Sequence, residues 1–356
     1  MFITKESLYS GFPIPTYKMY KIKEEFFMLT KRQNLLETIK GGNPDRYVNQ
    51  FEPFALQFMT PREVRFPEPD YGGAPRRNWF GVLIQWPKGT PGSFPVHGNQ
   101  KVIKDITHWK DFVTMPDTNY SEEEWAPWVA EAEKVDRNEQ FVTYFAWPGI
   151  FESLHYLMGM EDSLVNFYEE PECMHELIDF LTEYELRMAY TVCDHIHPDA
   201  IYRHDDWGSQ LSTFMSKQMF REFLLEPTKK IYDYYRSKGV VLVVHHTDSY
   251  CETFVPEMIE AGIDIWQGAM STNNLPKILQ EYGKDITIMG GIDNGKIDRK
   301  DWTKEAINAE TDRICELCGT KYFIPNTTYG GVGSVYEGVY EAVSNEINVL
   351  SKKFFK

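Results

Sequence analysis

The sequence has little cysteine and no long apolar run. Its five cysteines, an odd number, do not form the disulfide framework of a small secreted protein. No stretch approaches the roughly 18 apolar residues of a membrane helix. Residues 1–7 lack the cationic and apolar parts of a secretory signal. We therefore expect a cytoplasmic protein with no membrane partner.

An excess of positive charge is also missing, since the formal net charge is −16 at pH 7. Such a chain does not match the phosphates of nucleic acid, so no nucleic-acid partner is expected. The sequence also lacks low-complexity tracts and linkers rich in Gly, Ser or Pro. Residues 1–356 are accordingly expected to form one domain. An aromatic content of 15% favours a pocket for a flat, apolar ligand.

Short apolar runs alternate with amphipathic stretches along the chain. This alternation predicts an α/β protein built from strand–helix units, and eight such units make a closed (β/α)₈ TIM barrel. The eight predicted strands are 47–51, 81–86, 141–147, 200–204, 240–246, 263–267, 286–290 and 322–326.

Two segments depart from this repeat. Residues 1–42 resemble a helical extension that ends at Gly41-Gly42. Between the second and third predicted strands the chain inserts roughly fifty residues rich in Pro, Trp and Asp, which is too long for a simple connection. We expect an elaborated rim at that place.

The carboxyl ends of the predicted strands carry the candidate chemistry, because the active sites of such barrels lie there. His246 and Asp248 stand two apart after the most β-branched strand, so both can point into one mouth as metal ligands or as an acid–base pair. Alternation places His245 on the helix side. The preceding strand ends in His204-Asp205-Asp206, where one acid can cap a helix while the other binds substrate or orients His246.

Further polar and aromatic residues follow the other strands. Trp86, Trp147 and Tyr329 are candidates for stacking on a substrate ring, with core or rim packing as the equal alternative. The full set of candidate substrate-binding residues is Gln57, Trp86, Trp147, His204, Gln267, Asn326 and Tyr329.

Several segments resemble the uroporphyrinogen-decarboxylase superfamily. They are Lys31-Arg32 and Leu35-Leu36 with residues 42–48, Arg203–Gly208, the helix carrying Met219–Phe223, His246–Asp248 with 256–262, and Gly290–Asp293. The similarity runs from about residue 30 to the C-terminus, and it implies a (β/α)₈ barrel.

The superfamily contains decarboxylases and corrinoid-dependent methyltransferases. The decarboxylases carry an arginine-rich segment after the first strand, whereas this chain has Phe51–Met59 there and its nearest arginines are Arg62 and Arg65. Methyltransferases that act on coenzyme M hold zinc with His-x-Cys and a later Cys. Here Asp248 replaces the first cysteine, and Asn326 lies near the last strand without a cysteine, which argues against thiol activation.

Residues 322–336 look similar to the methyltransferase component of aryl methyl ether O-demethylases. That group is associated with a zinc motif of Glu, fourteen residues, Glu, twenty residues and His, which Glu161, Glu176 and His197 match in spacing. A metal, Zn²⁺ in the first instance, thus has two candidate sets: His246 with Asp248, or Glu161, Glu176 and His197.

The resemblance implies transfer of a methyl group from an aromatic methyl ether to cob(I)alamin on a partner corrinoid protein. His246, Asp248 and Asp206 are the predicted catalytic residues. A methylamine, a thiol or another small methyl donor stays open, as do a decarboxylase and a non-catalytic ligand-binding barrel. Monomer and homodimer are likewise both open.

Overall fold

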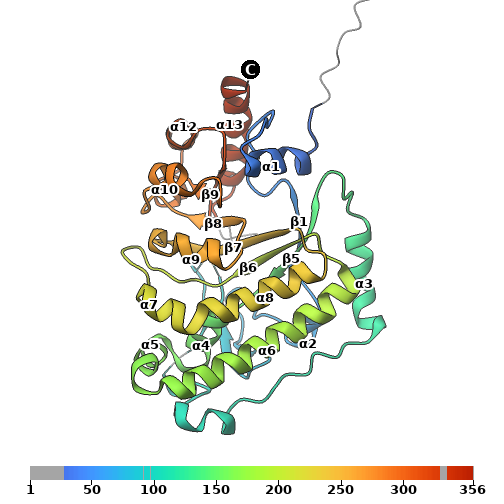
Figure 1. Ribbon diagram of the computed structural model, residues 1–356, viewed down its shortest axis with the longest axis vertical. Coiled ribbons are helices and arrows are strands. Elements are labelled where there is room, and N and C mark those ends of the chain that lie inside the picture. The colour runs from blue at the N-terminus through green and yellow to red at the C-terminus, as the bar shows by residue number, and fades with distance from the viewer. Residues whose placement is uncertain (1–27, 91, 97, 329–334, 356) are drawn as a thin grey trace, which may run out of the picture.

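The centre of the molecule is a curled, all-parallel sheet of seven strands (Figure 1). The computed structural model describes residues 28–90, 92–96, 98–328 and 335–355. Sheet order follows chain order, so each strand pairs with the next one along the sequence. The strands are β1 Phe54–Gln57, β5 Phe141–Ala146, β6 Ala200–His204, β7 Leu242–Ser249, β8 Ile265–Ala269, β9 Thr287–Gly291 and β10 Phe323–Asn326.

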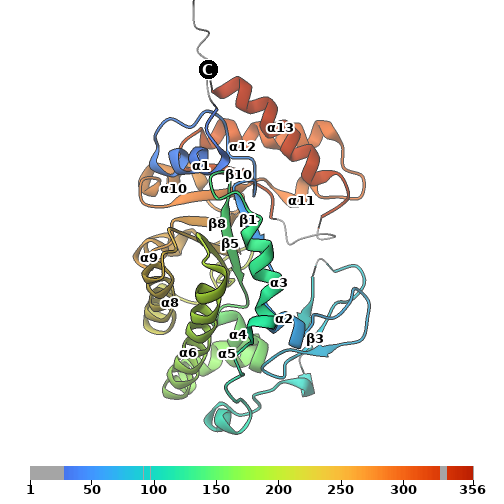
Figure 2. The same cartoon turned by 90° about the vertical axis from the view of Figure 1, so that its right-hand side faces the viewer.

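Helices connect these strands and cover the outside of the sheet. Figure 2 shows α6, α8 and α9 on one side, with the small sheet around β3 on the opposite side. The helices are α1 Lys31–Lys40, α2 Pro61–Arg65, α3 Glu122–Glu133, α4 Ile150–Met158, α5 Met160–Glu169, α6 Pro171–Ile196, α7 Lys217–Phe220, α8 Glu226–Ser237, α9 Val255–Glu260, α10 Leu275–Tyr282, α11 Asn294–Ile297, α12 Lys304–Cys318 and α13 Val339–Phe354. Shorter turns are η1 Gly98–Gln100, η2 Ile106–Asp111, η3 Arg221–Leu225 and η4 Glu252–Phe254. None of the helices in the described part of the chain is both long and apolar enough to cross a bilayer.

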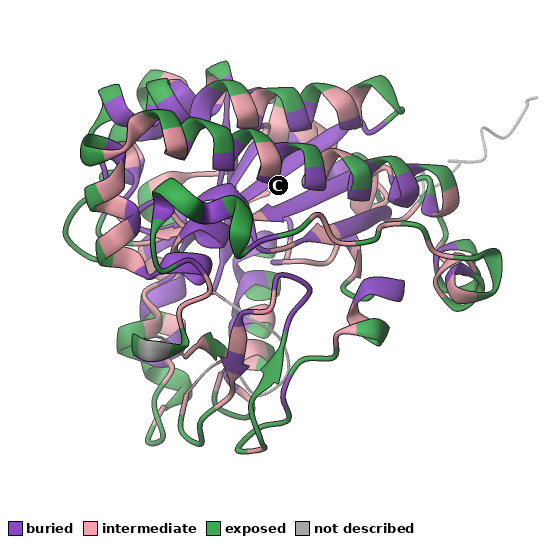
Figure 3. Ribbon diagram, turned by 90° about the horizontal axis from the view of Figure 1, so that it is seen from below, coloured by how far each residue is buried: buried purple, intermediate pink, exposed green. Residues whose placement is uncertain are grey.

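Alternate residues of each strand enter two different cores. Tyr202 and Val244 belong to a compact cluster inside the curled sheet, whereas Ile201, Val243 and Trp266 join the larger cluster between sheet and helices. Because side chains alternate along a strand, this assignment sets the direction of every later residue. The strands are buried on both faces, while the helices expose their outer sides (Figure 3).

The sequence correctly predicted a (β/α) barrel class of fold, but two of the eight predicted strands were wrong. Residues 47–51 form a loop, and the first strand begins only at Phe54. Tyr47 is buried there because its ring packs edge-on against Phe354 and Phe355, and its backbone N–H donates to Ser351 Oγ of α13, at 3.1 Å. A short apolar run can be a buried loop as well as a strand, and periodicity alone does not separate them.

The second wrong strand, 81–86, lies outside the parallel sheet. Its residues Leu83–Gln85 form β3 of a small antiparallel sheet with β2 Arg76–Arg77 and β4 Phe94–Pro95. The elaborated rim therefore lies between the first and second strands of the main sheet, β1 and β5, and not between the second and third.

The N-terminal extension is helical where the structure describes it. Helix α1 begins with a capping box in which Thr30 and Gln33 bond each other's backbone N–H groups. It ends at Gly41, whose φ of 61° is the left-handed conformation that glycine adopts without a Cβ penalty. Residues 1–27 of the predicted extension lie outside the described part.

Glycine at position 290 is required by the close approach of β8 and β9. Its φ is 155°, and a Cβ there would lie 2.3 Å from the backbone oxygen of Ala269. We expect Gly290→Ala to lower the free energy of unfolding by about 1–3 kcal/mol, the usual cost of such backbone strain. Chemical denaturation measures this change. Gly92→Ala is the matched control, because a Cβ at Gly92 meets nothing within 4 Å; an equal loss in both variants would contradict the prediction.

Candidate functional site

Three predicted residues stand side by side at the carboxyl end of the sheet. His204 of β6 is in register with His246 of β7, and His246 is in register with Gln267 of β8. Each lies two positions after a residue of the inner cluster, so all three side chains point to the inner face. We call this region, formed by the carboxyl ends of the seven strands, the barrel mouth.

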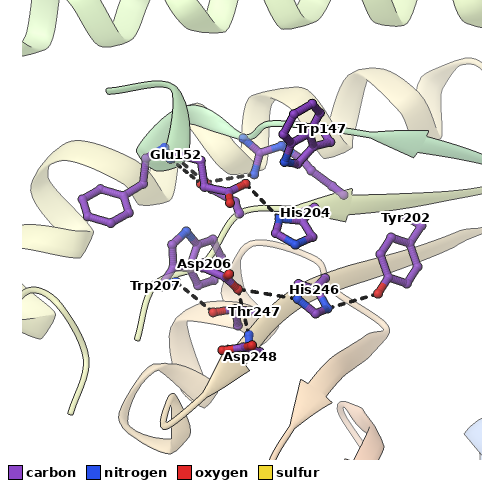
Figure 4. Close-up of polar contacts among 12 residues, drawn as sticks. Trp147, Glu152, Tyr202, His204, Asp206, Trp207, His246, Thr247 and Asp248 are labelled. Carbon is purple, nitrogen blue, oxygen red and sulfur yellow. Dashed lines mark hydrogen bonds and ion pairs between the residues drawn. The ribbon is translucent and has the colours of Figure 1, made fainter. Parts of the chain in front are cut away.

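Asp206 completes a compact cluster with the two histidines (Figure 4). The imidazole rings of His204 and His246 stack with centroids 4.2 Å apart. Asp206 Oδ1 lies 3.6 Å from His246 Nε2, which is too long for a hydrogen bond. The same oxygen accepts a hydrogen bond from the backbone N–H of Asp248, at 2.9 Å, which fixes the carboxylate in place.

His204 is anchored by a residue that the sequence analysis missed. Glu152 Oε2 lies 2.8 Å from His204 Nδ1, and the Glu152 side chain is almost fully buried. Glu152 sits in the first turn of α4, and the Asp205 carboxylate accepts from its backbone N–H at 2.9 Å. An acid in the first turn of the helix after β5 was a usable signal, since that turn returns to the barrel mouth.

His246 is held from its other side by polar residues of the inner face. Its Nδ1 contacts Gln267 Oε1 and lies 3.1 Å from the Tyr202 hydroxyl. Gln267 Nε2 donates to Asn326 Oδ1 at 2.7 Å, and Asn326 Nδ2 has no partner among the described residues. Tyr202 was missed because it lies inside β6, where an aromatic side chain reads as core packing.

The surroundings move the pKa values of the two histidines in opposite directions. Burial alone would lower the pKa of His204, but the Glu152 and Asp206 carboxylates raise it to about 9. Burial, with repulsion from His204, lowers the pKa of His246. Burial also raises the pKa of Glu152 to about 7 and, together with Asp206, raises that of Asp248. The surroundings thus favour the protonated form of His204 and the neutral form of His246.

The neighbours of these residues on the outer face are structural. His245 faces the helix layer as alternation predicted: its Nδ1 lies 2.6 Å from the Tyr232 hydroxyl, and its ring stacks on Trp207 at 3.9 Å. Asp205 caps α4 and lies 3.4 Å from Arg203. Of the two adjacent acids, Asp205 is therefore the capping residue and Asp206 the site residue.

Within the described residues, one group of at least three His, Cys, Asp or Glu side chains is arranged to hold a metal ion. It consists of His204, Asp206 and His246, whose ligand atoms all lie within 4.8 Å of one another. The predicted pairing of His246 with Asp248 needs correction, because Asp248 is outside this group and accepts a hydrogen bond from Ser249 Oγ at 2.6 Å. Two imidazoles and a carboxylate fit the donor preferences of zinc.

The alternative metal set is wrong for a geometric reason. Glu176 lies near the start of α6 and His197 at its C-cap, about 30 Å apart at the helical rise of about 1.5 Å per residue. Glu176 is also paired with Lys110, at 2.7 Å, outside the barrel mouth. The exposed Glu161 belongs to a different helix, α5. Matching sequence spacing does not bring the three residues together.

Aromatic side chains line one side of the cluster. Phe145 stacks on Tyr202 at 5.3 Å and lies 6.2 Å from the His204 ring. Phe58 follows β1, is half exposed, and packs on Phe145 at 5.0 Å. These two phenylalanines were not among the predicted site residues, because Phe58 stands in a loop and Phe145 inside a strand.

The remaining predicted residues have different positions. Gln57 ends β1, paired in register with Tyr144, and Trp147 directly follows β5, with its ring against Trp79 and Tyr156. Trp86 follows β3 of the small sheet, so its predicted place at the end of a barrel strand was wrong. Tyr329 lies outside the described residues.

Comparison with known proteins places this arrangement in context. The fold is similar to a methyltransferase from Methanosarcina mazei, with a TM-score of 0.63 and 15% identity over 90% of this chain and 99% of that one. It is less similar to a 3-keto-D-glucoside 4-epimerase from E. coli, with a TM-score of 0.37 and 12% identity over 63% and 84%. A B12-independent methionine synthase from Shewanella has a TM-score of 0.40 and 12% identity over 68% and 69%. These likenesses concern the fold.

Sequence similarity identifies the family of the chain. Among curated proteins none matches the chain. The family model for uroporphyrinogen decarboxylase (URO-D) matches residues 90–342, well over half of the chain, and this stretch contains every residue of the cluster. The chain therefore belongs to the uroporphyrinogen decarboxylase family.

Proposed function

We propose that this chain is a methyltransferase that moves a methyl group from an aromatic methyl ether to cob(I)alamin carried by a partner corrinoid protein. The observation that carries the proposal is the polar cluster of His204, Asp206 and His246 in a barrel mouth with aromatic walls. The fold similarity to a protein described as a methyltransferase supports the reaction class.

The reaction requires stabilisation of the negative charge that develops on the ether oxygen. The methyl carbon leaves the ether oxygen and becomes bonded to cobalt(I), and the electron pair of the broken C–O bond stays on the oxygen. A phenolate leaves poorly unless a proton or a Lewis acid reaches that oxygen. His204, which is partly exposed, and His246, which stacks on it, are the groups that would supply this help. Glu152 and Gln267 contact their Nδ1 atoms and hold the two rings in place.

The aromatic side of the mouth fits the rest of such a donor. Phe145 lies beside His204, and the half-exposed Phe58 packs on Phe145. A substrate ring held against Phe58 would therefore lie near the imidazoles. Trp147 directly follows β5, but its ring packs against Trp79 and Tyr156, so Phe58 and Phe145 are the rings assigned to the substrate.

The structure offers less to a decarboxylase substrate with many carboxylates. Arg62 is buried, stacks over Trp79 at 3.9 Å and donates to the Trp147 carbonyl. Arg65 is bound by Asp117 and Glu124. Both arginines closest to β1 are thus already engaged by groups of the protein.

Thiol donors are disfavoured by the donor atoms of the cluster, none of which is sulfur. Thiolate activation usually relies on sulfur-rich zinc sites. Cys251 lies four residues after Thr247 and contacts its hydroxyl, but burial raises the pKa of its thiol well above the ordinary range.

The test is a methyl-transfer assay with cob(I)alamin and several donor classes. The purified protein is incubated anaerobically with an aryl methyl ether, a methylamine or a methylated thiol, and methylcobalamin is followed by its visible spectrum. We expect methylcobalamin and free phenol with the aryl ether alone. Transfer from the other donors only would contradict the assigned substrate class, and the absence of transfer from every donor would contradict the methyltransferase.

A further inference from the structure

We propose that His204, Asp206 and His246 form an open, three-ligand site for a zinc-class divalent ion, and that Glu152 and Gln267 are the positioning residues that orient its two imidazoles. The inference deepens the proposed function, because it names how the site assists the leaving oxygen. The role of the ion in that chemistry rests on the proposed function. The binding of the ion itself depends only on the geometry described below.

The spacing of the ligand atoms fits a metal better than direct hydrogen bonds. Two donors that are each about 2.1 Å from a tetrahedral zinc ion lie about 3.4 Å apart. His246 Nε2 and Asp206 Oδ1 are 3.6 Å apart, close to that value and beyond hydrogen-bonding range. The third donor, on His204, lies within 4.8 Å of both, so a small adjustment suffices.

Glu152 leaves one nitrogen of His204 available. Its carboxylate oxygen lies 2.8 Å from Nδ1, and a carboxylate accepts the hydrogen of that nitrogen. Nε2 is then the atom that faces Asp206 and His246. A histidine whose far nitrogen donates to a buried carboxylate is the usual arrangement behind a metal ligand.

Gln267 has the same effect on His246, and the direction of its hydrogen bonds is fixed by its neighbour. Because Gln267 Nε2 donates to Asn326 Oδ1, its Oε1 must face His246 and accept from Nδ1–H. The Tyr202 hydroxyl bonds the same oxygen and adds a second restraint. Nε2 of His246 therefore carries the lone pair on the side of Asp206.

The donor set indicates the class of ion and the state of the site. Two imidazole nitrogens and one carboxylate oxygen match catalytic zinc sites, which have three protein ligands and keep a further position for water or substrate. His204 and Asp206 are partly exposed, with side-chain exposures of 23% and 29%, so that position opens into the barrel mouth. An ion there would act as a Lewis acid on the ether oxygen.

The experiment measures metal binding in the absence of any methyl donor or corrinoid. The full chain is stripped with a chelator and titrated with Zn²⁺ by calorimetry, and with Co²⁺ by its visible ligand-field bands. We expect one ion per chain and cobalt bands typical of a four- or five-coordinate site. Lack of stoichiometric binding of both ions, or bands of a fully hydrated octahedral ion, would overturn the inference.

Variants connect the binding to these residues. Asp206→Asn keeps the oxygen that accepts from Asp248 N–H but loses the charge, and it should weaken binding at least 100-fold, as should His246→Ala. Glu152→Gln and Gln267→Leu should weaken it about 10–100-fold, the usual effect of losing an outer-shell partner. Unchanged binding in folded Asp206→Asn, verified by circular dichroism, would overturn the assignment of the ligands.

The matched controls are variants of Glu176 and His197, which the structure keeps apart from each other and from the cluster. Glu176→Gln and His197→Asn change exposed residues of α6, and Asn tolerates the positive φ of 49° at position 197. Both variants should bind Zn²⁺ and Co²⁺ with the affinity of the unchanged protein. Weaker binding of either ion would overturn the inference. Zinc binding without methyl transfer supports the metal site and contradicts only the proposed function, whereas methyl transfer by a chain that binds no ion contradicts the metal site alone.

Discussion

His246→Ala is expected to lower kcat for methyl transfer by about 10²–10⁴-fold, the range for loss of a positioned acid–base group. His246 contacts the other residues of the site: it faces Asp206, stacks on His204 and is held by Gln267. The fold should persist, because Tyr202 and Gln267 remain hydrogen-bonded to each other when the imidazole is gone. The steady-state rate of methylcobalamin formation with saturating cob(I)alamin and methyl donor measures the loss.

The control for this variant is a second histidine. His197→Asn changes an exposed residue at the end of α6, and we expect its rate to stay within twofold of the unchanged protein. Thermal unfolding of both variants shows whether the fold is intact. Full activity in folded His246→Ala would remove this residue from the mechanism.

Glu185→Ala is expected to lower the free energy of unfolding by about 3–5 kcal/mol, because it leaves a buried charge without its main partner. Arg203 has no exposed side-chain surface, and two of its nitrogens lie 2.8 Å from the two carboxylate oxygens of Glu185. Asp205, at 3.4 Å, is a weaker second partner. A loss of this size is a large part of the roughly 5–15 kcal/mol that holds a typical domain together.

A matched acid on the same helix provides the comparison. Glu183 also pairs with an arginine at 2.8 Å, Arg187, but both side chains are half exposed. Glu183→Ala should therefore cost less than about 1 kcal/mol. Urea denaturation of both variants measures the difference, and equal costs would contradict the argument from burial. A change in the slope of the transition would indicate an altered unfolded state instead.

Strand patterns predicted much of the fold because buried strands consist of runs of apolar residues that can be recognised in the sequence. The run Leu242–Val244 is apolar and buried, as a strand covered on both faces must be, and it begins β7. The segments 47–51 and 81–86 carry a similar pattern for another reason, since one packs as a loop under α13 and the other forms a small separate sheet. Local composition reports that a segment is buried, and only long-range contacts decide what covers it.

Period-two alternation predicted part of the site correctly. It placed His246 on the inner face and His245 against the helices, which the contacts of both residues confirm. The alternation pattern did not identify Glu152 or Tyr202 as site residues, because their roles depend on contacts with residues 52 and 44 positions away in sequence. The same limit explains why Glu161, Glu176 and His197 matched a spacing without sharing a site.

The sequence by itself determined the class of fold and the inner-face position of His246 at the carboxyl end of its strand. These properties follow from burial and alternation, which act between neighbours along the chain. Only the tertiary structure decided that His204 and Asp206, and not Asp248, share the cluster with His246. The reason is that strand register and the return of α4 to the barrel mouth set which side chains lie within a few ångströms of each other, and neither is encoded in local spacing.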